Sequence, residues 1–406
     1  MEPTATRAAP VFPMHRTSPL TIAPEYDELR TREPIAKVAM PTGELVWLVT
    51  SYDYVRQILA DPRVSADRRQ PHFPIFPGVP NRKLLVENFR GGLLGMDPPE
   101  HTVHRRLLMG EFTVKRVRAM RPRIQELVDE CVTRMLREGG PADLVQALSY
   151  PVPAHVVTDM LGMPYADRET VDRCTKLTLN PAAGDDERSA AGAELRALFA
   201  AWVARKEQDL GDDLLSRVII RYREAGQYDR RQMAGMAGAL LSGGHETTAN
   251  MISLGAMALL RHPDQLAQLR DDPSRMPAAV EEFLRFFSPL SEFAGYRVAL
   301  ADIEIGGVLI RAGDGLIALG SAANRDGAVY DRPDELDVGR DAHNHVAFGY
   351  GMHQCLGQNL ARLELEIALA TLFRRIPGLR LAVPPAELRF KDHATIYGLY
   401  DLPVTW

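Results

Sequence analysis

The sequence predicts a mainly α-helical fold with small β-sheets, and two patterns support that prediction. Apolar residues recur with helical spacing over most of the chain from residue 99 onward. Residues 44–50 and 297–318 instead combine β-branched or alternating apolar residues with glycine-containing turns, which is typical of strands. Hydrophobic residues make up 46% of the 406-residue chain and charged residues 25%, a composition that can bury a large core.

The first hundred residues are expected to mix short strands with loops, with a helix at 51–59 after the first strand. Proline and glycine break any regular pattern over 71–95, and a long irregular stretch in a compact domain is usually functional or disordered. Helices are then expected at 99–109, 114–138, 151–161, 189–208, 212–225, 229–260, 263–270, 275–287 and 356–374. No repeat or linker divides the chain, so we expect one domain over 19–406 after a flexible lead-in at 1–18.

Charge and cysteine content exclude several classes of protein. A net charge of -5 gives no electrostatic case for nucleic-acid binding. Cys131, Cys174 and Cys355 form an odd, sparse set that suits a reducing compartment better than a disulfide framework. The early prolines lie where a signal peptide needs an apolar stretch, so we expect a cytoplasmic protein.

The apolar segment 233–260 is the one stretch that could suggest a membrane span. His245, Glu246 and Asn250 lie at its centre, and a charged residue in mid-bilayer costs about 2.5–3.5 kcal/mol. We therefore expect a long helix buried inside the protein and no membrane association.

The most informative segment surrounds Cys355, in the run 348–357 with the sequence FGYGMHQCLG. Its glycines permit positive φ angles and a close approach of the backbone to a flat object. Cys355 stands just before a predicted helix, whose unpaired N–H groups favour the thiolate form that binds a metal. A lone cysteine is more often a buried structural residue, but this spacing favours a metal ligand.

This segment resembles the ligand loop of the cytochrome P-450 family, F-x-x-G-x-x-x-C-x-G, which Phe348, Gly351, Cys355 and Gly357 match. The resemblance implies a haem b cofactor whose iron is bound by the thiolate of Cys355. It also implies a set of cofactor-binding residues in this loop: Phe348 beside the sulfur, Gly349, Gly357, and His353 at a haem propionate.

Glu282 and Arg285 lie one helical turn apart, a spacing that is common on solvated helix faces. Ahead of the cysteine loop they resemble the family's E-x-x-R pair, with Arg340 as its third, downstream member. The aromatic residue usual in that segment is replaced by Leu336. The resemblance implies a structural role for the three charged residues.

Two glycines and an acid interrupt the long apolar helix at Gly243, Gly244, Glu246 and Thr247. Glycine inside a helix costs about 1 kcal/mol relative to alanine, and the plain explanation is a kink with satisfied polar groups. The segment also resembles the family's oxygen-activation motif. On that resemblance the glycines make room for dioxygen, Thr247 hydrogen-bonds it, and Glu246 relays protons.

Cationic partners for the haem propionates are expected from two further segments. His101 and Arg105 lie four residues apart in a stretch resembling the family's bacterial C-helix motif. Arg297 matches the arginine that follows the E-x-x-R helix. Each alone is more often a surface charge, but with His353 they would surround two carboxylates.

Residues 104–123 are locally basic, either as a solvated helix face or as a docking surface for an acidic ferredoxin. The docking hypothesis assigns Arg105, Arg106, Arg116 and Arg118 to that surface. Ferredoxin reductase would then act indirectly, passing electrons from NAD(P)H to the ferredoxin.

The resemblance runs from Pro19 to the C-terminus and implies the family's triangular, single-domain fold and a soluble bacterial, actinobacterial type of protein. The implied reaction inserts one atom of dioxygen into a bulky apolar substrate by hydroxylation or epoxidation, as in secondary metabolism. We expect Leu94, Ala239, Phe293 and Ile396 to line a pocket for a macrolide, terpenoid, steroid or polyketide. A monomer is expected.

Two alternatives remain open at this point. The protein could be a peroxide-driven peroxygenase, which Glu246 and Thr247 argue against. It could also be a haem-dependent sensor, which would show no turnover with a functional redox chain. A purely helical scaffold is the remotest alternative, because it would not need a glycine-flanked cysteine.

Overall fold

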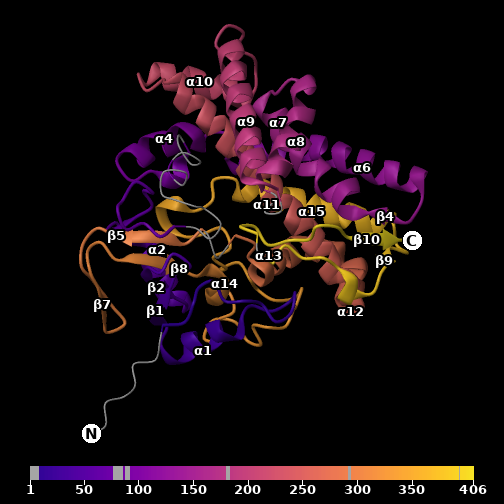
Figure 1. Cartoon of the computed structure of the whole chain (residues 1–406). Coiled ribbons are helices and arrows are strands. Elements are labelled where there is room, and N and C mark those ends of the chain that lie inside the picture. The colour runs from indigo at the N-terminus through magenta and orange to yellow at the C-terminus, as the bar shows by residue number, and fades with distance from the viewer. Residues whose placement is uncertain (1–8, 76–85, 87–91, 180–182, 291–293, 393) are drawn as a thin grey trace. The chain divides into compact units, whose positions relative to one another are not determined.

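The structure is a computed structural model of the chain. This structure describes residues 9–75, 86, 92–179, 183–290, 294–392 and 394–406 (Figure 1). The mainly helical fold with small sheets is confirmed. Internal contacts divide the chain into two compact units. The first unit contains 1–88, 290–335 and 346–354, and the second contains 89–289, 336–345 and 355–406.

The first unit holds most of the β-structure. Its elements are α1 (Pro24–Arg32), β1 (Ile35–Ala39), β2 (Leu45–Val49), α2 (Tyr52–Ala60), β3 (Val64–Ser65), β5 (Tyr296–Ala299), β6 (Ile303–Ile305), β7 (Val308–Ile310), β8 (Gly315–Ala318), α14 (Gly320–Ala323) and a 3-10 turn, η5 (Gly351–His353). Five strands form one sheet in the order β1-β2-β8-β5-β3, and β6 pairs with β7 separately. The expected strands at 44–50 and 297–318 are therefore confirmed.

One apolar cluster joins the sheet of the first unit to α2. Val49, Val55 and Leu316 are fully buried in it. The indole of Trp47 on β2 donates to Asp314 Oδ2 at 2.7 Å, next to the parallel β2–β8 pairing. This packing gives the 346–354 loop a fixed base, because Val346 belongs to the same cluster.

The second unit is helical. Its longer helices are α4 (Glu100–Met109), α5 (Val114–Ala119), α6 (Arg121–Glu138), α7 (Pro151–Leu161), α8 (Arg168–Leu179), α9 (Asp185–Lys206), α10 (Leu214–Glu224), α11 (Arg230–Arg261), α12 (Pro263–Asp271), α13 (Met276–Phe287) and α15 (Gln358–Arg375). Its short elements are η1 (Leu93–Gly95), β4 (Ala142–Asp143), η2 (Val145–Ser149), η3 (Tyr165–Asp167), η4 (Pro273–Arg275), β9 (Arg380–Leu381), η6 (Pro385–Glu387) and β10 (Pro403–Thr405).

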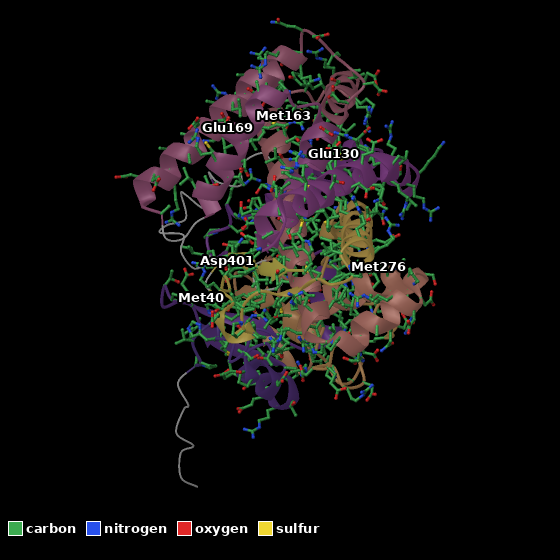
Figure 2. All side chains as sticks on the ribbon, turned by 90° about the vertical axis from the view of Figure 1, so that its right-hand side faces the viewer. Met40, Glu130, Met163, Glu169, Met276 and Asp401 are labelled. Carbon is green, nitrogen blue, oxygen red and sulfur yellow. The ribbon has the colours of Figure 1, made fainter. Side chains whose placement is uncertain are left out.

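Helix α11 lies at the centre of the second unit and contacts α7, α9, α13 and α15 (Figure 1). Its residues from Thr248 to Leu259 are buried. By contrast, Glu130 on α6 and Glu169 on α8, both labelled in Figure 2, are exposed to solvent. Its position explains why 233–260 is so apolar in sequence. Among the described residues, no helix is long and apolar enough to cross a membrane.

The expected helices recur, but one is divided and further helices were not expected. The single helix expected over 114–138 is divided at Met120, and Pro122 occupies the first turn of α6, where proline is tolerated. Helix α1 was not expected, and neither was α8, whose sequence RETVDRCTKLTL contains three Thr, one Val and one Cys, residues that favour helices weakly. The domain boundary at residue 19 remains a prediction.

Residues 389–392 and 394–401 contribute the two arms of a hairpin near the C-terminus of the second unit. Phe390 bridges Leu399 in antiparallel fashion, and the Phe390 and Tyr397 rings stack at 6.0 Å between centroids. Arg389 pairs with Asp401, which is labelled in Figure 2. The chain then ends in β10, the central strand of a small β4-β10-β9 sheet.

Candidate functional site

Cys355 is a half-buried free cysteine three residues before α15. Loss of hydration around the buried sulfur atom raises the pKa of the Cys355 thiol. Backbone N–H groups of Gly357 and Gln358 hydrogen-bond the sulfur and act in the opposite direction, as do the charges of Arg105 and Arg362. The N–H donors and the two cations therefore offset part of the effect of burial and favour the thiolate form.

The loop that precedes Cys355 belongs to the first unit and depends on its glycines. Gly349 and Gly351 have φ angles of 70° and 72°, which strain any residue with a Cβ. At Gly351 a Cβ would also lie 2.5 Å from the carbonyl oxygen of Leu59. Phe348 and His353 in this loop are half-buried. The glycines therefore let the loop close onto α2.

Arg56 on α2 holds the same loop through its neighbour Tyr350. Its guanidinium donates to the Tyr350 hydroxyl at 2.8 Å and lies 4.3 Å from the ring centroid. The backbone N–H of Val346 donates to Asn324 Oδ1 at 2.8 Å. Neither contact could be predicted from local sequence, because the partners in each are distant in the chain.

His101 and Arg105 lie four residues apart on α4, on one face of the helix as expected. His101 is buried, and burial followed by the charge of Arg105 lowers its pKa. Burial also lowers the pKa of Arg105, while the sulfur of Cys355 acts in the opposite direction. Within the second unit, Arg105 is thus a partly desolvated cation close enough to Cys355 to affect it.

Arg297 on β5 is buried in the first unit, where it donates to the carbonyl oxygens of Ala294 and Tyr296 at 2.9 and 2.7 Å. Arg68 is also buried, and its pKa falls to about 9 because of burial and of the nearby charge of Arg297. Two buried guanidinium groups that repel each other favour binding of an anion. Sequence reasoning missed Arg68, since nothing in its local sequence marks it.

Glu282, Arg285 and Arg340 form one buried cluster in the second unit. Arg285 donates to both oxygens of Glu282, at 2.7 and 2.8 Å, and neither side chain is exposed. Arg340 Nε donates to Glu282 Oε1 at 3.2 Å, and the backbone N–H of Asp337 does so at 3.0 Å. Both carboxylate oxygens are therefore satisfied, and the cluster fastens 336–340 to α13.

A second buried cluster, which sequence reasoning missed, adjoins the first. Arg362 on α15 donates to both oxygens of Glu281, at 2.6 and 3.0 Å. His345 Nε2 lies 3.1 Å from Glu281 Oε2. Burial raises the pKa of Glu281, but the hydrogen bonds and charges of His345 and Arg362 have the larger effect and lower that pKa to about 2. Arg362 thus connects this ion pair to the surroundings of Cys355.

The two glycines of α11 have different surroundings. A Cβ on Gly243 would meet no atom within 4 Å, whereas one on Gly244 would lie 3.3 Å from Val157 Cγ2 on α7. Gly244 thus allows α7 to pack closely, and Gly243 leaves open space along the helix. Thr247 is half-buried, and its hydroxyl donates to the Gly243 carbonyl at 2.7 Å.

Glu246 faces the C-terminal hairpin of the second unit. Its Oε1 accepts a hydrogen bond from Lys391 Nζ at 3.0 Å, and Lys391 also donates to Asn250 Oδ1 at 3.2 Å. Both members of the Glu246–Lys391 pair are largely buried. Lys391 was not predicted, because 145 residues separate it from Glu246.

The basic segment is only partly available to a partner. Arg116, Arg121 and Arg123 pair with acidic residues, respectively Glu111 at 3.6 Å, Glu366 at 2.8 Å and Asp159 at 3.0 Å. Three exposed cations have no ion pair in the described part of the chain: Arg106, Lys115 and Arg118. Met109 and Val114, which are 52% and 48% exposed, lie between them in sequence.

Three of the expected pocket residues lie in the second unit. Leu94 on η1 is exposed, Ala239 on α11 is half-buried, and Ile396 in the hairpin is buried. Phe293 lies outside the described residues.

The residues present fit a haem group. Haem needs an axial donor and cations for its two carboxylates. The second unit by itself offers the Cys355 sulfur and the nearby cation of Arg105. Within the first unit, Arg297 and Arg68 are a separate pair of buried cations. A mainly helical fold with such a cysteine before a long helix defines the class of haem-thiolate proteins.

Comparisons with known proteins agree. A sequence model described as Cytochrome P450 matches residues 194–377. Pentalenic acid synthase of Streptomyces avermitilis is 47% identical over 406 residues, covering 100% of both chains. Vitamin D3 dihydroxylase of Streptomyces griseolus is 43% identical, covering 99% of this chain and 98% of the relative. The crystal structure of cytochrome P450 MoxA from Nonomuraea recticatena superposes with a TM-score of 0.91 at 47% identity, covering 97% of this chain and 98% of that one.

This chain belongs to the cytochrome P450 family. It is a monooxygenase of the bacterial type, and its cofactor is haem b. The family resemblance inferred from the cysteine loop is therefore confirmed.

Proposed function

We propose that the protein inserts one atom of dioxygen into a bulky apolar substrate, with Cys355 as the iron ligand. The observation that carries this proposal is the environment of the Cys355 sulfur. The sulfur accepts hydrogen bonds from the backbone N–H groups of Gly357 and Gln358, and the charges of Arg105 and Arg362 also act on it. Haem b, when bound, supplies the activation of dioxygen. The protein's residues hold the cofactor, orient the substrate and move protons.

The cofactor's carboxylates are assigned to the cationic residues of each unit. His101 and Arg105 are the candidates in the second unit, and Arg297, Arg68 and His353 are the candidates in the first unit, each set taken by itself. Buried guanidinium groups gain most from such partners, because an anion offsets their desolvation. Phe348, Gly349 and Gly357 would shape the loop around the sulfur.

Proton delivery is assigned to α11. Thr247 lies one turn from Gly243, whose missing side chain leaves open space beside the helix. Glu246 is the adjacent carboxylate, and its Oε2 has no hydrogen-bond partner among the described residues. A carboxylate with one uncommitted oxygen can accept and release a proton next to the Thr247 hydroxyl. This pair favours oxygen activation over peroxide-driven chemistry.

Electrons are proposed to come from NAD(P)H through a ferredoxin reductase and a ferredoxin. The docking surface would be the exposed part of α4 and α5, which carries Arg106, Lys115 and Arg118 together with the exposed side chains of Met109 and Val114. Exposed cations without ion pairs suit an acidic electron carrier. Of the residues expected for docking, Arg105 is half-buried and Arg116 pairs with Glu111, so they contribute less.

The substrate is proposed to be a bulky apolar molecule such as a macrolide, terpenoid, steroid or polyketide. Ile396 and Ala239 supply apolar surface in the second unit, as does Leu94. Two relatives are named for pentalenic acid and vitamin D3, which supports a search among such compounds. Both hydroxylation and epoxidation agree with the site.

A reconstituted turnover assay tests the function. Purified protein is first screened for substrate-induced spectral shifts with vitamin D3, pentalenic acid precursors and macrolides. The compound with the largest shift is then incubated with NADH or NADPH, a bacterial ferredoxin and its reductase, or with hydrogen peroxide instead. Product that requires the ferredoxin supports the proposal, and product with peroxide alone would favour a peroxygenase. Reduction without turnover of any compound would favour a haem sensor.

A further inference from the structure

Lys391 is a charged residue that the functions assigned so far do not use. It comes from the C-terminal hairpin, its side chain is 11% exposed, and its ammonium group lies between Glu246 Oε1 at 3.0 Å and Asn250 Oδ1 at 3.2 Å. Glu246 and Asn250 are one helical turn apart on α11, so the ammonium group contacts one face of that helix.

The hairpin holds this lysine in place through its backbone. The N–H of Lys391 donates to the carbonyl of Gly398 at 2.9 Å, across the two arms of the hairpin. Gly398 itself lies against α11, because a Cβ there would come within 2.0 Å of Asn250 Oδ1. The lysine therefore reaches Glu246 from a base with little freedom.

The two oxygens of Glu246 have different surroundings. Oε1 accepts from Lys391, whereas Oε2 is buried with no hydrogen-bond partner among the described residues. Two aromatic rings lie near the Lys391 end of the pair: Lys391 Nζ lies 6.0 Å from the centroid of the Tyr150 ring, which in turn meets His245 edge-on at 4.6 Å. Lys391 is therefore the one hydrogen-bond partner of this buried carboxylate among the described residues.

We propose that Lys391 is a positioning residue that holds the Glu246 carboxylate by Oε1, so that only Oε2 exchanges protons during oxygen activation. This inference rests on the proposed role of Glu246 in proton delivery. Loss of the ammonium group would let the carboxylate turn or take up a proton permanently. Dioxygen, two electrons and two protons would then leave together as hydrogen peroxide instead of being used to form product and water.

The test compares five variants of the full-length haem protein: K391M, K391R, E246Q, the double variant E246Q/K391M, and R389M. The last is a matched control, since it removes one positive charge from the same hairpin at the Arg389–Asp401 pair. Each variant is first checked for an intact carbon monoxide band and for its thermal midpoint. If K391M fails to retain haem, K391Q replaces it, because glutamine keeps a hydrogen-bond donor without the charge.

Product and hydrogen peroxide are then measured per NAD(P)H consumed, in water and in deuterium oxide, with the compound selected by the spectral screen. We expect K391M to lose about tenfold in product formation, to release more peroxide and to change the solvent isotope effect. K391R should recover most of the loss, R389M should match the wild type, and the double variant should be no worse than E246Q. The thermal midpoints of the single and double variants should also show coupling between the two residues.

Other outcomes distinguish failure of the Lys391 proposal from failure of the proposed proton-delivery role of Glu246. An E246Q variant that retains normal coupling would contradict the role of Glu246 itself. An impaired E246Q with a normal K391M would overturn the role of Lys391 alone. Equal losses in K391M and K391R, with an unchanged isotope effect, would reduce Lys391 to a structural contact and overturn the proposal.

Discussion

Glu282 on α13 and Glu246 on α11 are both buried carboxylates in the second unit, but their hydrogen bonding differs. Glu282 accepts hydrogen bonds on both oxygens, from Arg285, Arg340 and a backbone N–H. Glu246 has one partner, Lys391, and its second oxygen has none among the described residues. A carboxylate with both oxygens committed to hydrogen bonds can fasten two segments together, whereas one with an uncommitted oxygen can offer it to a further partner. On the proposed function, this difference separates a structural carboxylate from one that delivers protons.

The largest effect is expected at the saturated carboxylate. Glu282→Gln leaves two buried arginines without their anion and should lower the free energy of unfolding by about 3–5 kcal/mol. Urea unfolding measures this, with Glu335→Gln as control, because that surface partner of Arg332 is 61% exposed. The control should change stability by no more than about 0.5 kcal/mol. Equal effects of both variants would break the comparison.

Glu281 extends the comparison to pH. Its folded-state pKa of about 2 lies below the ordinary value of 4.5, so its stabilising contribution is complete above pH 4.5. That contribution, about 3 kcal/mol, is lost as the pH falls toward 2. The unfolding free energy of the wild type should therefore decrease more steeply between pH 5 and 3 than that of Glu281→Gln. Parallel pH curves for the two proteins would show that the pair with Arg362 and His345 adds no stability.

The half-satisfied carboxylate should affect rate more than stability. Glu246→Gln should retain the haem-thiolate spectrum and lower the rate of product formation by about 10²-fold. Its loss in unfolding free energy should be smaller than that of Glu282→Gln. A destabilisation equal to that of Glu282→Gln, at normal turnover, would reverse the two roles.

The same contrast between paired and unpaired charges predicts the smallest effect, on the surface. Arg106 and Arg118 are exposed and have no ion pair in the described part of the chain, so their double reversal to Glu should slow reduction by ferredoxin about tenfold at low salt. Arg137→Glu on the far end of α6 is the control for charge. Stopped-flow reduction rates that match the wild type at every salt concentration would exclude this docking surface.

Most of the helices could be predicted because their apolar periodicity reflects burial directly. The cysteine loop, the E-x-x-R pair and the α11 motif were also visible, because each lies within a few residues of sequence. The break at Met120 and helix α8 were missed, because local propensities there are weak or conflicting.

The contacts between distant segments around the site could not be predicted from local sequence patterns. Lys391 meets Glu246, and Arg362 meets Glu281, only after distant segments pack together. The charge of Arg297 lowers the pKa of Arg68 although the two residues are 229 positions apart in the sequence. Lone charged residues in unremarkable sequence give no sign of such partners.

The central claim is that Cys355 binds the haem iron as a thiolate. The most direct test is the absorption spectrum of the purified protein, reduced with dithionite and exposed to carbon monoxide. We predict a strongly red-shifted Soret band that is lost in Cys355→Ala and retained in Cys131→Ala, which removes a different buried cysteine. Folded protein, expressed with ample haem, that binds no haem would contradict the claim. So would a red-shifted band that survives in Cys355→Ala.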